Sequence, residues 1–89
     1  MILTRSTQFK KDYELLVHQG KDISKLDSVI VDLANNVNLE GKYKIYQHSG
    51  WQKLYRTLYI APDWILIYKL DEAKGELSLA RTGHPANVN

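Results

Sequence analysis

The sequence predicts an α+β fold in which a helical hairpin packs on one face of a small, mainly antiparallel sheet, with the element order β-α-α-β-β-β. Apolar residues in the first half recur at the spacing of an amphipathic helix, whereas those in the second half alternate as in half-buried strands. Short connections between the later strands favour antiparallel neighbours. Helices on one face leave the other face of the sheet for a partner or a substrate.

The size and composition of the chain fit a small globular protein. Its 89 residues predict a single domain over residues 1–89. The absence of cysteine predicts neither a disulfide framework nor a thiolate metal site, and it fits a cytoplasmic location. No apolar run approaches the ~18 residues of a membrane span, and the first residues lack a signal-peptide pattern. A net charge of +2 permits a nucleic-acid or an acidic protein partner without requiring either.

The first half of the chain predicts a short edge strand and then two helices. Met1–Thr4 is apolar enough for the strand, and Ser6 or Thr7 can cap the first helix. Gly20 stands where a left-handed C-terminal cap is expected. The apolar stripe of this helix contains Phe9, Tyr13, Leu16 and Val17.

The second helix follows after a very short connection. Asp22 is placed to cap it, and Asn35-Asn36 ends it. Its apolar stripe contains Ile23, Leu26, Val29, Ile30 and Leu33. Residues 38–50 have no clear period, and we interpret them as a loop, with an irregular strand as the alternative.

The rest of the chain predicts three strands in a meander. Apolar and polar residues alternate over residues 54–60, and Pro62-Asp63 marks a turn. Residues 64–70 are nearly all apolar, which is typical of a central strand buried on both faces. After a turn over 71–75, residues 76–82 alternate again.

A hairpin of the last two strands would gather polar residues at one end of the sheet. Asp63 opens one strand, and Arg81 and His84 stand at the end of the next. An acid, an arginine and a histidine together suit chemistry on a phosphodiester. The alternative is a structural salt bridge between Asp63 and Arg81, because Arg81 has the strand parity of Leu77 and Leu79. The structural alternative for Trp64 is a buried position in the core, and for His84 it is a solvent-exposed position in the C-terminal tail.

These residues resemble the RelE/YafQ family of bacterial toxins, and its YafQ branch most closely. The similarity is tightest over Tyr55-Arg56, over Pro62-Asp63-Trp64-Ile65-Leu66-Ile67-Tyr68-Lys69 and over Arg81-Thr82-Gly83, and the order of elements matches over the whole chain. The resemblance implies a ribosome-dependent endoribonuclease that arrests translation. It also implies a DinJ/RelB-like antitoxin in a heterotetramer or larger complex, with operator DNA bound only through the antitoxin and no membrane partner.

Carried over residue by residue, the resemblance implies a catalytic set of His48, Asp63, Arg81 and His84. Cleavage without a metal needs a base near the 2′-OH, an acid near the leaving oxygen and positive charge on the phosphate. We therefore expect Asp63 or His48 to act as base, His84 as acid and Arg81 as a phosphate clamp. No cofactor is expected, and the three histidines lack metal-ligand spacing.

A second set is expected to bind RNA. Trp64 would stack on a base, Lys53 and Arg56 would bind backbone phosphates, and Tyr59 would donate a hydrogen bond or serve as a weak acid. The family usually has a histidine in place of Tyr59, and one more residue before the histidine matched by His84. These departures leave a degenerate, non-enzymatic binding module or corepressor as one alternative. A gyrase poison of the ParE branch is the other, and the presence of Asp63, Arg81 and two nearby histidines argues against it.

Overall fold

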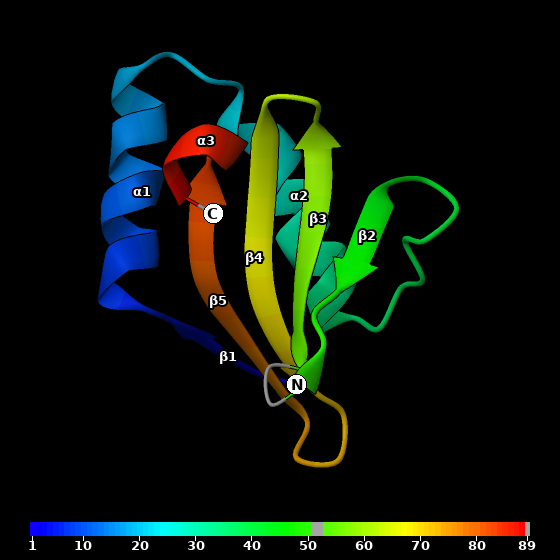
Figure 1. Ribbon diagram of the computed structural model, residues 1–89. Helices are drawn as coiled ribbons and strands as arrows, with labels where there is room; N and C mark the ends of the chain where they lie inside the picture. The colour runs from blue at the N-terminus through cyan, green and yellow to red at the C-terminus, as the bar shows by residue number, and fades with distance from the viewer. Residues whose placement is uncertain (51–52, 89) are drawn as a thin grey trace.

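The computed structural model describes residues 1–50 and 53–88, in which a five-stranded sheet has the order β1-β5-β4-β3-β2 (Figure 1). Pairing is antiparallel throughout except between β1 and β5, which are parallel. The predicted α+β class and mainly antiparallel sheet are confirmed. The elements are β1 (Ile2–Arg5), α1 (Thr7–His18), α2 (Ile23–Ala34), β2 (Lys44–Gln47), β3 (Tyr55–Ala61), β4 (Trp64–Asp71), β5 (Glu76–Gly83) and α3 (Pro85–Val88).

The helix ends follow the local signals in the sequence. The Ser6 hydroxyl accepts the backbone N–H of Phe9 at 2.9 Å, which caps α1 as predicted. Gly20 has a φ of +74°, the left-handed conformation expected after this helix. Asp22 stands at the N-cap of α2, but its carboxylate accepts the hydroxyl of Ser24 and no backbone N–H of the first turn.

Two elements go beyond the predicted order. Residues 44–47, within the segment interpreted as a loop, form edge strand β2, and α3 follows β5, so that the order is β-α-α-β-β-β-β-α. Both ends of β2 are exposed, which explains the weak apolar period. The short helix α3 follows Gly83, where a Cβ would come within 3.1 Å of Val88 Cγ1 and φ is +144°. Glycine therefore lets α3 fold back against the sheet.

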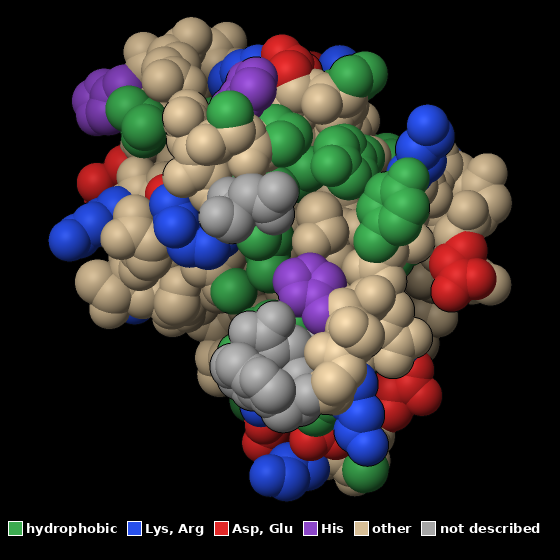
Figure 2. Space-filling model, viewed as in Figure 1, with side chains coloured by type: hydrophobic (Ala, Val, Ile, Leu, Met, Phe, Trp, Pro, Cys, Tyr) green, Lys and Arg blue, Asp and Glu red, His purple; other side chains and the backbone are tan. Residues whose placement is uncertain are grey.

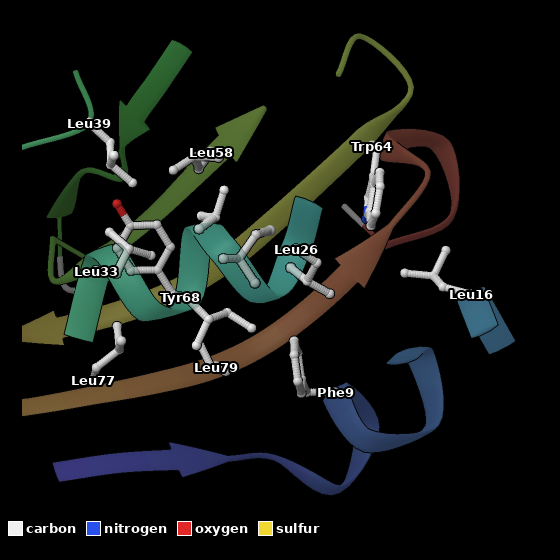
Figure 3. Packing of buried hydrophobic residues seen from close by; sticks show 13 residues of the cluster. Phe9, Leu16, Leu26, Leu33, Leu39, Leu58, Trp64, Tyr68, Leu77 and Leu79 are labelled. Carbon is white, nitrogen blue, oxygen red and sulfur yellow. The ribbon is translucent and has the colours of Figure 1, made fainter. Parts of the chain in front are cut away.

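The main core lies between the helices and one face of the sheet. In Figure 3, Leu26 and Leu33 of α2 point toward Leu58, Tyr68 and Leu79 of the sheet. Figure 1 places α2 behind the sheet and α1 along the edge of β5, beyond the end of β1. We call the face away from α2 the open face. No helix within residues 1–50 and 53–88 is long and apolar enough to cross a membrane.

The open face is covered at one end by α3. Ile65 of β4 is 1% exposed and Val88 of α3 is 7% exposed, yet neither belongs to the core cluster on the helix side. Figure 1 shows α3 in front of the end of β5, on the side away from α2. Strand β4 is thus buried on both faces at this end, as its apolar run predicts.

Candidate active site

A β-bulge turns Arg81 toward the open face. Leu79 pairs with Tyr68, but Arg81 pairs with Ile67, because the register shifts between these pairs. Tyr68 belongs to the core cluster on the helix side, so its neighbour Ile67 lies on the open face, and Arg81 lies there with it. The predicted shared parity of Arg81 and Leu79 is wrong, because the bulge inserts Ala80 as an extra residue.

The partner of Arg81 is Asp12 of α1. Arg81 Nε donates to Asp12 Oδ2 at 2.7 Å, and Arg81 Nη2 lies 3.3 Å from Oδ1. The same carboxylate accepts the backbone N–H of Thr82 at 3.2 Å and the side-chain amide of Gln8 at 3.2 Å. The alternative salt bridge between Arg81 and Asp63 is therefore wrong.

Asp12 is a site residue that the sequence prediction misses. It stands three residues after Phe9 and four before Leu16, so it lies on the apolar stripe of α1. Its side chain is only 8% exposed. An acid on a buried helical stripe requires a partner, because an unpaired buried charge is costly. The position of Asp12 on the apolar stripe is therefore the sequence feature that indicates a buried partner.

Arg81 can bind an anion while it is paired with Asp12. A guanidinium has five N–H donors, and Asp12 occupies Nε and one side of Nη2. The hydrogen bond to Asp12 raises the pKa of Arg81 above its ordinary value, so the group stays cationic. Its side chain is 34% exposed. The remaining donors can reach a phosphate while Asp12 holds the stem in place.

His48 also lies on the open face. Its Nε2 is 2.9 Å from Thr57 Oγ1, and its backbone N–H donates to Tyr55 at 2.9 Å, just beyond the end of β2. Thr57 and Arg81 both pair with Ile67, from opposite sides. Arg81 and Thr57 thus stand in one cross-strand row about 10 Å apart, and the imidazole of His48 lies at one end of this row.

Asp63, Arg81 and His84 surround one cavity of about 480 Å³ between α1, the β3–β4 turn and α3. The predicted gathering of these three residues at the end of the sheet is therefore found. His84 Nδ1 accepts the backbone N–H of Ala86 at 3.0 Å, so the neutral ring carries its proton on Nε2. His84 is exposed and begins the turn that leads into α3.

Two residues beside this cavity have mainly structural contacts. The Asp63 carboxylate lies 3.6 Å from Lys21 Nζ, and its side chain is 58% exposed. Trp64 is 4% exposed, and its indole N–H donates to Thr82 Oγ1 at 3.1 Å. The prediction that Trp64 stacks on an RNA base does not fit this burial, because both ring faces are covered; Figure 3 shows the ring beside Leu16.

The other predicted RNA-binding residues are scattered. Arg56 pairs with Tyr68 and lies on the helix side of the sheet, away from the open face. Burial raises the pKa of Tyr68, and the nearby Arg56 opposes that rise. Lys53 is exposed before β3, and its carbonyl oxygen accepts the Gln47 amide. Tyr59 lies on the open face, two residues after Thr57 on β3.

No group of His, Asp or Glu side chains within residues 1–50 and 53–88 is arranged to hold a metal ion. Figure 2 looks onto the open face and shows histidine side chains that lie apart from one another. The residues of the site thus offer separated proton-transfer groups and one fixed cation. That arrangement suits a reaction in which a proton is removed at one point and returned at another, across a charged phosphate.

Comparison with known proteins places this geometry among toxins. A family model for the bacterial toxin of a type II toxin-antitoxin system, YafQ, matches residues 1–88. The mRNA interferase toxin YafQ of Escherichia coli strain K12 is 40% identical over 79 residues, which cover 88% of this chain and 84% of that protein.

Solved structures agree. The crystal structure of YafQ from E. coli strain BL21(DE3) matches with a TM-score of 0.84 and 39% identity, covering 94% of this chain and 92% of that one. The crystal structure of the E. coli DinJ-YafQ complex matches with a TM-score of 0.86, with the same identity and coverage.

Proposed function

The chain belongs to the YafQ family of bacterial type II toxins, and we propose that it is an endoribonuclease that cleaves ribosome-bound mRNA. The observation that carries the proposal is the cross-strand row on the open face, where Arg81 stands across from the Thr57–His48 pair. A single RNA strand can lie over this row because α2 covers only the opposite face. We infer a cytoplasmic location, because ribosome-bound mRNA is the proposed substrate.

The proposed reaction uses the RNA's own 2′-OH as nucleophile. His48 removes the proton of the 2′-OH, because its ring is held on the open face by Thr57. The 2′ oxygen then attacks the adjacent phosphorus, and the bond to the 5′ oxygen breaks. A protonated His84 returns a proton to that leaving oxygen from Nε2, and protonation of its Nδ1 releases the Ala86 N–H that the neutral ring accepts. Asp63, which lines one cavity with Arg81 and His84, is the alternative base.

Arg81 stabilises the charge that develops on the phosphate. Two parallel N–H donors match two phosphate oxygens, and Asp12 fixes their direction before substrate arrives. Charge stabilisation of this kind is worth about 3–4 kcal/mol in other enzymes.

An antitoxin is the expected protein partner. The related E. coli toxin was crystallised in a complex with DinJ. By analogy we infer that a DinJ-like antitoxin binds this chain and suppresses its activity, and that any operator DNA is bound through the antitoxin.

The proposal predicts growth arrest on expression, and its loss in the double variant Asp63→Ala, Arg81→Ala. The variant removes the clamp and one of the two candidate bases. Optical density after induction measures the effect. The matched control Glu14→Ala, Lys25→Ala removes one exposed acid and one exposed base from the helices, and it should arrest growth like the wild type.

Co-expression of the cognate antitoxin should relieve the arrest. Retained binding of the antitoxin by the double variant shows that its chain is folded. Continued arrest by a folded double variant would show that the assigned site is wrong.

A further inference from the structure

Two tyrosines stand together on the open face beside the candidate site. Tyr46 of β2 pairs with Thr57, and Thr57 precedes Tyr59 by two residues on β3, so both rings are on the same side of the sheet. Their ring centroids are 5.8 Å apart with an interplanar angle of 84°. The contact between the two rings leaves aromatic surface open to solvent, since Tyr46 is 54% exposed.

The groove around these tyrosines is basic and aromatic. It has a volume of about 460 Å³, within the range of small-molecule sites. Its described lining contains two lysines and no acid: Lys42, Tyr43, Lys44, Tyr46, Tyr59, Ile60, Ala61 and Pro62. Figure 2 shows hydrophobic side chains gathered over the neighbouring ends of β2 and β3, with basic side chains at the rim.

The two lysines lie beside the tyrosine rings, where they can contact the anionic group of a ligand that stacks on the rings. Lys44 pairs directly with Tyr59 across the two strands. Lys42 Nζ lies 5.6 Å from the ring centroid of Tyr43, and both residues come just before β2. A flat ring with a cation beside it suits a nucleotide, because the base has a π-face and its phosphate is an anion.

The groove continues the row that contains Arg81 and His48. Arg81, Ile67, Thr57 and Tyr46 are successive Cα partners across four strands. Tyr46 also precedes His48 by two residues, so the two side chains emerge on one face. An RNA strand that crosses Arg81 and His48 therefore reaches Tyr46 next. This continuity favours RNA over an acidic peptide as the occupant.

We propose that this groove binds an unpaired base of the RNA substrate, stacked on Tyr46 and Tyr59, with a neighbouring phosphate on Lys44. The inference deepens the proposed function and rests on it, since the ligand is that enzyme's substrate. It also replaces Trp64, which is buried, as the stacking platform.

Titration of the ¹⁵N-labelled full chain with a short 2′-O-methyl oligoribonucleotide, followed by NMR, tests the proposal. This probe has no free 2′-OH and cannot be cleaved. We expect amide shifts at residues 42–46 and 59–61. Tyr46→Ala should weaken the affinity about 5- to 150-fold, the effect of one lost base stack, whereas Tyr46→Phe keeps a ring and should bind like the wild type. Lys44→Ala should reduce the salt dependence by about one unit of slope.

The control Tyr13→Ala removes a tyrosine from α1, outside the groove, and should leave RNA affinity unchanged. A folded Tyr46→Ala variant with wild-type affinity would overturn the proposal, as would shifts confined to other surfaces or no shifts at millimolar RNA. The titration needs neither a ribosome nor cleavage. Codon-phased cleavage without shifts in the groove would thus refute this inference alone, whereas shifts in the groove without any cleavage would refute the proposed activity alone.

Discussion

Replacing Arg81 with lysine is expected to reduce the rate of mRNA cleavage by about 10²-fold while the chain stays folded. Lysine keeps a cation beside Asp12, but it lacks the planar pair of donors that fits two phosphate oxygens. Removal of one preorganised donor from a developing oxyanion costs about 10²–10³ in rate. Single-turnover cleavage on programmed ribosomes measures the loss.

The conservative change matters because Arg81→Ala would also leave Asp12 buried without its cation, and the two effects would be mixed. Arg5→Lys, the same change on edge strand β1, is the matched control and should cleave like the wild type. If Arg81→Lys cleaves at the wild-type rate, Arg81 serves only the structural pair with Asp12.

Replacing Asp12 with alanine is expected to lower the free energy of unfolding by roughly 3 kcal/mol, the lower end of the range for broken buried pairs, because Arg81 is about one-third exposed. The change removes the acceptor of both the Arg81 guanidinium and the Thr82 N–H. For a domain of this size the midpoint of thermal unfolding should fall by on the order of 10–20 °C. Circular dichroism measures it.

Asp12→Asn is the informative companion variant. Its amide oxygen can still accept the Thr82 N–H, but it carries no charge for Arg81. We expect a smaller loss of stability than for alanine. An alanine variant as stable as the wild type would show that the Asp12–Arg81 pair does not hold α1 against β5.

The helices, the last three strands and the polar cluster were predictable because their signals are local. Leu26, Val29, Ile30 and Leu33 repeat at helical spacing, and the structure buries all four. The caps at Ser6 and Gly20 depend on single residues with known conformational preferences. The meander follows from alternation and short turns, which place the ends of β4 and β5 beside each other.

The remaining features depend on contacts between distant segments. Edge strand β2 has one partner and an exposed sequence, so alternation does not reveal it. The bulge at Ala80 is a property of the β4–β5 register, and it decides on which face Arg81 lies. Likewise, the pairing of Asp12 with Arg81 joins residues 69 positions apart in the chain. The apolar stripe of α1 indicates that Asp12 needs a partner, but the periodicity of neither segment identifies that partner as Arg81.

The central claim is ribosome-dependent cleavage of mRNA at the open face, and primer extension on mRNA translated in a purified system tests it most directly. The reaction is run with and without this protein, and a parallel reaction omits ribosomes. We expect cuts at codon-phased positions only when ribosomes and the wild-type protein are both present, and their loss with Arg81→Lys. Folded wild-type protein that produces no cuts in the presence of ribosomes would contradict the account.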